Sequence, residues 1–409
     1  MQNIPGLGDD IYCREWHVDP DIPMSEDCLY LNIWTGAGKE NEKLPVLVWF
    51  FGGGLQCGYT AEMEFDGERL ARRGIVVVSV NYRVNVFGFL AHPQLTSQQP
   101  DAPANFGSLD QQAGLRWVLR NIAAFGGDPE NVTIAGQSAG GGSVLSQMTC
   151  PDNFGMFQKA VIMSAMIRSP YEEGGVRVPQ PLWEAEENGQ HFFGFLGVSC
   201  LEEARKLDAA FMAGNTSDEF LNFIPADSEE ELEERAKELF GEEADTFLAF
   251  PESRRRDERR GYAGVSGTEC TIKGIFANEK GEHGERYYYR FDPDIPGWDQ
   301  PGTFHSSDLW FFFETLAKCW RPFVGHHYDL ARKMCTYWVN FIKTGNPNGL
   351  DADGSALEEW RPYTKENPCG MAFESAGPRA LDGEETGFAS FLTDRIIRSM
   401  ERGKVWQDG

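Results

Sequence analysis

The chain has 409 residues, of which 41% are hydrophobic and 13% aromatic, so it can bury a large core and extended disorder is not expected. A formal net charge of −26 at pH 7 disfavours nucleic acids and anionic membranes as partners. No uninterrupted apolar run approaches the length of a membrane span, and no linker-like tract divides the composition. We expect one domain over residues 1–409, with a helical excursion over roughly 166–285.

The number and spacing of the cysteines argue against a protein stabilised by disulfides or by a structural metal. The nine cysteines are too few and too irregularly spaced for a disulfide framework, and none forms a pair with zinc spacing. We therefore expect no metal and no other cofactor. The odd number leaves at least one thiol free, and the start Met1–Gly6 lacks the basic and apolar regions of a signal peptide. Both features predict a cytoplasmic protein.

Strands and helices alternate along the chain. Two continuous apolar runs, Leu44–Phe51 and Ile75–Tyr82, are typical of strands buried on both faces of a parallel sheet, and a helix is expected between them over Phe65–Arg73. Ser108 and Gln111 have the spacing of a capping box, which predicts that a helix begins there. The later predicted elements are strand Asn131–Ala135, a helix from Gly142, strands Ala160–Ser164, Phe211–Gly214 and Arg286–Phe291, and helices Asp227–Phe240 and Tyr328–Lys343. This alternation predicts an α/β fold with a central, mostly parallel sheet and helices on both faces.

The candidate nucleophile is Ser138, in Gly136-Gln137-Ser138-Ala139-Gly140. Small residues on either side let a serine occupy the strained, exposed turn between a strand and a helix that is called the nucleophile elbow. The helix that follows directs its amide groups and dipole at the site, which favours a developing negative charge. The pentapeptide alone occurs by chance in many proteins, so its context between strand and helix carries the prediction.

Three consecutive glycines, Gly52 to Gly54, follow the first apolar strand. Without a Cβ atom, the backbone can approach a substrate and direct its N–H groups at it, although such a run can also be only a flexible loop. Together with the downstream elbow, it predicts an oxyanion hole formed by the amides of Gly53, Gly54 and Ala139.

A serine hydroxyl needs a general base, so one of the seven histidines should lie within reach. In hydrolases with a nucleophile elbow the chain order is serine, acid, histidine, which excludes His17 and His92. His305 lies in a loop after a predicted strand, where this class of fold holds catalytic groups, whereas His326 and His327 begin a long helix. We predict His305 as the base.

Longer motifs make the chain resemble the type B carboxylesterases, the carboxylesterase and cholinesterase family. They cover residues 25–165 almost without a break and become sparser afterwards. The matching stretches are Ser25–Trp34, Gly52–Gly54, Asn81–Val84, Gly88–Leu90, Asn105–Gly107, Asp110–Gln112, Phe125–Pro129, Gln137–Gly141, Gly214–Glu219, Phe304–Leu309 and Asn340–Gly349. The resemblance implies an α/β-hydrolase fold and a serine hydrolase that cleaves carboxylic esters through an acyl-enzyme.

The family's Ser-Glu-His triad, carried over by position, falls on Ser138, Glu219 and His305. From the residues alone the acid stays open between Asp218 and Glu219, because neighbours on an extended segment point to opposite sides and only one can face the histidine. The resemblance favours Glu219, since the family uses the second carboxylate of its Asp-Glu pair. Asp218 is then expected to be a turn or capping residue.

The sequence departs from the family pattern in several places. Phe51 stands where many relatives have His or Tyr, and Gln137 replaces the usual Glu before the serine, which removes a negative charge beside it. By comparison with the family pattern, we expect the chain to be shortened at its start and between Arg168 and Ala210. Neither departing residue belongs to the triad, so we expect tuned rather than lost activity.

Two possible modifications are expected to be absent. Relatives often have a disulfide where Cys13 and Cys28 stand, and in a reducing cytoplasm both thiols should be free. Asn131-Val132-Thr133 matches a glycosylation sequon but lies against a core strand, so we expect it to be unmodified.

The expected partner is a small, uncharged aryl or alkyl ester, because aromatic residues are plentiful and the acidic surface disfavours polyanions. Two alternatives stay open: a non-catalytic binding protein on the same fold, and a hydrolase of amide, thioester or carbamate bonds, which the same triad could serve. The sequence carries no signal for the oligomeric state.

Overall fold

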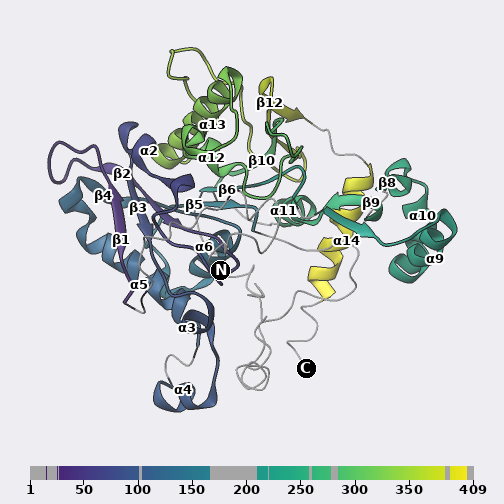
Figure 1. The fold of residues 1–409 in the computed structure, drawn as a ribbon, viewed down its shortest axis with the longest axis horizontal. Coiled ribbons are helices and arrows are strands. Elements are labelled where there is room, and N and C mark those ends of the chain that lie inside the picture. The colour runs from purple at the N-terminus through teal and green to yellow at the C-terminus, as the bar shows by residue number, and fades with distance from the viewer. Residues whose placement is uncertain are drawn as a thin grey trace.

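The structure of the protein is a computed structural model. It describes residues 27–100, 104–165, 210–219, 221–257, 260–277, 284–382 and 387–402, together with Glu15 and Ser25. In this part of the chain a large central sheet has helices against both faces, and a smaller sheet lies to one side with helices of its own (Figure 1).

The central sheet has the strand order β1-β3-β2-β4-β5-β6-β10-β11-β12 in the described residues. Its outermost pairs, β1 with β3 and β11 with β12, are antiparallel, and all pairs between them are parallel. The strands are β1 (Leu31–Trp34), β2 (Leu44–Phe50), β3 (Val76–Val80), β4 (Gly127–Gln137), β5 (Lys159–Met163), β6 (Ala210–Thr216), β10 (Arg286–Asp292), β11 (Cys369–Glu374) and β12 (Gly377–Asp382). The predicted strands are all present, and the predicted fold class is confirmed.

Helices cover both faces of this sheet and continue beside the smaller one (Figure 1). The α-helices are α2 (Glu68–Arg72), α3 (Asn85–Phe89), α4 (Pro93–Gln98), α5 (Phe106–Asn121), α6 (Ala139–Thr149), α9 (Glu229–Phe240), α10 (Ala244–Leu248), α11 (Gly267–Ala277), α12 (Leu309–Phe312), α13 (Gly325–Thr344) and α14 (Gly387–Arg402). The 3₁₀ helices are η1 (Met63–Phe65), η2 (Ile122–Phe125), η3 (Pro151–Asn153), η4 (Gly241–Glu243), η5 (Pro251–Arg254) and η6 (Leu316–Lys318). Among the described helices, none is both long and apolar enough to cross a bilayer.

The unbroken apolar strands are explained by burial on both sides. Along β2, Val46 and Val48 pack in a cluster with residues of α5, α6 and α11, whereas Leu47 and Trp49 pack in a second cluster with α12 and α13. Successive side chains of a strand point to opposite faces of the sheet, and here both faces are covered. All four residues are therefore fully buried, which is why the sequence of the strand is apolar throughout and does not alternate.

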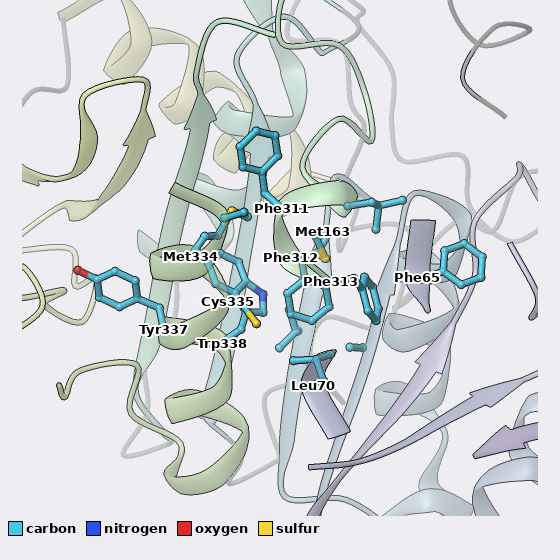
Figure 2. Close-up of a cluster of buried hydrophobic side chains, with 14 of the residues drawn as sticks. Phe65, Leu70, Met163, Phe311, Phe312, Phe313, Met334, Cys335, Tyr337 and Trp338 are labelled. Carbon is cyan, nitrogen blue, oxygen red and sulfur yellow. The ribbon is translucent and has the colours of Figure 1, made fainter. Parts of the chain in front are cut away.

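Aromatic residues dominate the core under α12 and α13 (Figure 2). Trp338 of α13 lies edge-on to Tyr289, with ring centroids 5.1 Å apart, and 5.7 Å from Phe312. Phe313 in turn lies edge-on to Trp49 of β2 at 4.9 Å. These contacts fix the segment after β10 against the sheet, and that segment includes His305.

Two predicted helix starts are wrong. The capping box at Ser108 does not form, because α5 already begins at Phe106 and Gln111 is buried inside it, where its amide donates to the Ser143 hydroxyl at 2.8 Å. The first turn of α5 is packed closely at Gly107, where a methyl group would overlap the backbone oxygen of Arg83. Similarly, α6 begins at Ala139 and not at Gly142.

The predicted excursion over roughly 166–285 lies partly outside the described residues, which omit 166–209. The rest of it contains helices and also β6 of the central sheet, together with a small antiparallel sheet in the order β7-β9-β8. These strands are β7 (Leu221–Ile224), β8 (Arg256–Asp257) and β9 (Gly261–Ser266). A separate cluster of buried residues, with Phe240, Phe247 and Leu392 among them, joins this sheet to α9, α10 and α14.

Candidate active site

The predicted site residues all follow parallel strands of the central sheet at their carboxyl ends. The glycine run follows β2, Ser138 follows β4, Glu219 follows β6, and His305 lies in the connection from β10 to α12. In an open α/β sheet this edge is where ligands bind. The strand order β2-β4-β5-β6-β10 brings residues that are far apart in sequence to one edge.

Ser138 occupies a strained turn. Its backbone has φ 55° and ψ −126°, a conformation that residues with a Cβ rarely adopt. The turn is held by the Ser138 amide, which donates to the carbonyl of Met163 at 2.8 Å, and by the Gly142 amide, which donates to the Ser138 carbonyl at 3.0 Å. A methyl group at Gly140 would overlap the carbonyl oxygen of Phe50, which explains why small residues flank the serine.

The glycine run lies directly against this turn. A methyl group on Gly52 would lie 3.2 Å from the Cβ of Ser138. Gly53 and Gly54 have φ values of 99° and 64°, which only glycine adopts freely. Within the described part of the chain, the amides of Gly53, Gly54 and Ala139 donate to no backbone or side-chain acceptor, so they are available to a ligand.

Phe51, directly before the glycine run, is held in place by Tyr82. Its ring stacks on Tyr82 with centroids 4.3 Å apart, and the Tyr82 hydroxyl donates to the Phe51 carbonyl at 2.7 Å. The departure at Phe51 therefore lies in a packed aromatic pair that fixes the start of the glycine run.

Glu219 is the carboxylate that contacts His305. Its Oε1 lies 2.8 Å from the Nδ1 of His305, and its Oε2 accepts a hydrogen bond from the Thr216 amide at 3.1 Å. Glu219 is fully buried and His305 is 5% exposed, so their attraction is little screened by solvent. This geometry assigns different places to the two adjacent acids.

Asp218 faces away from the histidine ring and binds the other loop. Its Oδ2 accepts hydrogen bonds from the Thr303 amide at 2.8 Å and from the Thr303 hydroxyl at 3.1 Å. The Ser217 hydroxyl bonds both Thr303 and Asp292, the latter at 2.5 Å. We call Ser217, Asp218 and Thr303 the loop clamp, because these residues hold the loop of Glu219 against the loop of His305.

The remaining ring nitrogen of His305 faces Gln137. The two Nε2 atoms are 3.2 Å apart, and Gln137 is 2% exposed. No hydrogen bond of the Ser138 hydroxyl is found among the described residues, so in this structure Gln137, and not Ser138, contacts the Nε2 of His305. The sequence marked Gln137 as a departure and did not predict this contact.

A second carboxylate, Asp308, lies near enough to Glu219 and His305 for their charges to act on it. It is fully buried and accepts a hydrogen bond from the Tyr289 hydroxyl at 2.9 Å, while its Oδ1 has no partner among the described residues. Burial, with a smaller contribution from the charge of Glu219, raises the pKa of the Asp308 carboxyl to about 7. In the sequence Asp308 is only one residue of the Phe304–Leu309 motif, because its burial depends on the tertiary fold.

The other histidines take no part in this arrangement where the structure describes them. His92 caps α4 on the surface, and the His327 ring accepts from the Val324 amide and contacts the Asp294 carbonyl. His17 lies outside the described residues, as does Cys13, whereas Cys28 is a free thiol. No cluster of three or more metal-binding side chains occurs in the described residues.

The Asn131 side chain of the possible glycosylation sequon makes two hydrogen bonds within the protein. The Asn131 amide donates to the Lys343 carbonyl at 3.2 Å, and its oxygen accepts from the Lys159 ammonium.

Comparison with known proteins gives the family. The family model described as "Carboxylesterase family" matches residues 9–251 and 268–380. The chain belongs to the carboxylesterase family. Among solved structures, the Geobacillus stearothermophilus carboxylesterase EST55 matches with a TM-score of 0.65 and 28% identity, covering 92% of this chain and 89% of that one. A PNB esterase matches with a TM-score of 0.64 and 27% identity, covering 92% and 87%.

Curated relatives share parts of the chain. Mouse cholinesterase is 46% identical over 154 residues, which are 37% of this chain and 25% of that protein. Human bile salt-activated lipase is 29% identical over 84% of this chain and 56% of its own length, and the fumonisin B1 esterase of Sphingopyxis macrogoltabida is 29% identical over 79% and 69%. The match thus covers a quarter of the length of the mouse cholinesterase and about half of the length of the human lipase.

The raised pKa of Asp308 predicts a pH-dependent stability. The ordinary value is 3.8, so between about pH 4 and 7 the folded protein holds a proton that the unfolded chain has lost, and the free energy of unfolding falls as pH rises through this window. Asp308→Asn cannot ionise, so its free energy of unfolding relative to the parent should increase by about 1 kcal/mol or more from pH 5 to pH 8. Urea unfolding at both pH values measures the difference.

The matched control is Asp329→Asn, on the exposed side of α13. Its free energy of unfolding relative to the parent should be the same at both pH values. An equal pH trend in the two variants would contradict the assignment to Asp308.

Proposed function

We propose that this protein is a serine hydrolase of carboxylic esters, with Ser138 as nucleophile, His305 as general base and Glu219 as the acid that orients the base. The observation that carries the proposal is the buried contact of 2.8 Å between Glu219 and His305, beside a serine in a strained turn. Family membership supports the same reaction.

The mechanism begins with proton transfer from Ser138 to the Nε2 of His305 as the serine oxygen attacks the ester carbonyl carbon. The Ser138 hydroxyl turns toward Nε2 in the substrate complex, as catalytic hydrogen bonds often form only then. The carbonyl oxygen becomes an oxyanion and accepts hydrogen bonds from the amides of Gly53, Gly54 and Ala139. His305, now an imidazolium stabilised by Glu219, donates the proton to the leaving alcohol.

The acyl group is then removed from Ser138 by water. His305 accepts a proton from the water as it attacks the acyl carbonyl, the same amides bind the second oxyanion, and the proton returns to Ser138 when the ester bond breaks. The products are a carboxylic acid and an alcohol. No step requires a metal or an organic cofactor.

The proposed substrates are small, uncharged aryl or alkyl esters. The net charge of −26 disfavours anionic substrates, and the abundance of aromatic residues favours an apolar pocket. We place the protein in a reducing compartment, the cytoplasm, which the free thiol of Cys28 supports. Mass spectrometry of alkylated protein should find Cys13 and Cys28 unlinked, and a quantitative link between them would contradict this location.

A fluorophosphonate probe tests the nucleophile directly. The probe should label Ser138, and Ser138→Ala should lose both the label and ester turnover, with kcat lower by about 10⁴ to 10⁶ because the triad acts as a unit. Peptide mapping locates the label, and a panel of acetyl, butyryl, octanoyl and hydroxycinnamoyl esters measures turnover. An unlabelled but folded parent protein would favour a non-catalytic binding protein, and turnover of amides, thioesters or carbamates without esters would favour the other hydrolase.

Two adjacent acids give a matched test of the triad. Glu219→Gln should lower kcat by about 10⁴, because an amide favours the wrong imidazole tautomer and cannot stabilise the cation. Asp218→Asn keeps an oxygen for Thr303 and should reduce kcat far less, with its loss mainly in melting temperature, since it weakens the loop clamp. The opposite ranking of the two kcat values would assign the acid to Asp218.

A further inference from the structure

Gln137 is enclosed between the glycine run and the histidine. It is the last residue of β4 and its Cα pairs with Met163 of β5, so its backbone is fixed by the sheet. A methyl group on Gly52 would lie 3.2 Å from the Gln137 Oε1, while the Nε2 of Gln137 lies 3.2 Å from the Nε2 of His305. The amide therefore contacts the ring atom that has to accept the serine proton.

The contact of Glu219 with the other ring nitrogen determines which group donates in this hydrogen bond. Glu219 Oε1 lies 2.8 Å from Nδ1, so an ionised Glu219 requires a proton on Nδ1. The neutral ring then has its lone pair on Nε2, which needs a donor, and of the two ends of the Gln137 amide only the N–H end can donate. Donors are thus aligned from Gln137 to His305 and from His305 to Glu219.

We propose that Gln137 is a positioning residue whose amide donates to the Nε2 of His305, keeping the ring neutral and correctly oriented until Ser138 takes its place. The proposal rests on the proposed role of His305 as general base. A donor at Nε2 favours the neutral ring, because an imidazolium has a proton at that position and would repel it. A carboxylate at residue 137 would do the opposite.

Two carboxylates and one guanidinium of the described residues lie near the ring. Glu219 approaches from the connection after β6, and Asp308, at the start of α12, acts on His305 through its charge. Arg321 reaches the neighbouring Phe304, with its guanidinium carbon 5.3 Å from that ring centre. These groups are the same in every variant below, so a change between variants reports on residue 137.

The test compares the pH dependence of kcat/KM in the parent, Gln137→Met and Gln137→Glu. Activity requires the neutral base, so kcat/KM rises with pH through the titration of the base. Gln137→Glu should move this rise upward by about one pH unit or more, because an opposite charge at this distance favours the imidazolium. Gln137→Met, which only removes the donor, should cause a smaller upward shift.

A measurement without turnover accompanies the kinetics. Nitrogen-15 NMR of histidine-labelled protein, with the His305 signals assigned by His305→Gln, gives the titration midpoint of the ring. The midpoints should increase in the order parent, Gln137→Met, Gln137→Glu, and the parent's neutral ring should show an unprotonated Nε2. Gln98→Glu, the same charge change on exposed α4, should leave the midpoint and the kinetic profile unchanged.

The outcomes separate the two proposals. Equal midpoints in the parent and both Gln137 variants would overturn the role of Gln137, whether or not the protein hydrolyses esters. A parent protein that neither turns over esters nor reacts with fluorophosphonate would overturn the proposed function, while the midpoints would still test the hydrogen bond to Nε2.

Discussion

Contact between backbones at the carboxyl edge of the central sheet is the constraint on which the site depends. Gly136 and Gly140 lie so close to backbone oxygens, of Gly140 and Phe50 respectively, that neither can carry a side chain. Because of this approach α6 begins immediately after the turn, and Ser138 is forced into a conformation that residues with a Cβ rarely adopt. The Gly52 backbone comes close to Ser138 in the same way.

The strain at this turn persists because the surrounding sheet is rigid. Both faces of β2 and β4 are buried under helices, so a relaxation of the turn would disturb apolar packing on two sides. The same sheet supplies the other groups, since Glu219 and His305 follow strands that lie beside one another as β6 and β10. The site residues come from separate connections, but their relative positions are fixed because the strands before them belong to one rigid sheet.

The sequence was sufficient for features determined by local composition. The unbroken apolar runs gave the strands, and the elbow pattern with its glycines gave the candidate nucleophile and amides. The choice of Glu219 over Asp218 came from resemblance, and the contacts of the two side chains supply its physical reason. Features that depend on tertiary contacts were not predictable, as the wrong helix start at Ser108 illustrates: α5 begins at Phe106, and Gln111 is buried and bonded to Ser143 instead of capping the helix.

Gln137 and Asp308 belong to the same unpredictable class. Gln137 stands out in the sequence only as a departure from the family pattern and Asp308 only as part of a motif, because each acquires its environment when the connection from β10 to α12 folds back over the sheet edge. Polarity alone would have placed both on the surface, since isolated glutamine and aspartate residues are mostly exposed in proteins.

The loop clamp also bears on how this family member can vary. Thr303 is held by Ser217 and Asp218 only two residues before His305, and the aromatic core anchors the chain again at α12. The stretch 293–301 between β10 and the clamp is anchored as well, because Ile295 is buried in the core and Asp299 pairs with Arg321, whose guanidinium lies over Phe304. A change at Asp299 would therefore reach the residue before His305 through Arg321, so evolution can vary this stretch freely only where its side chains face solvent.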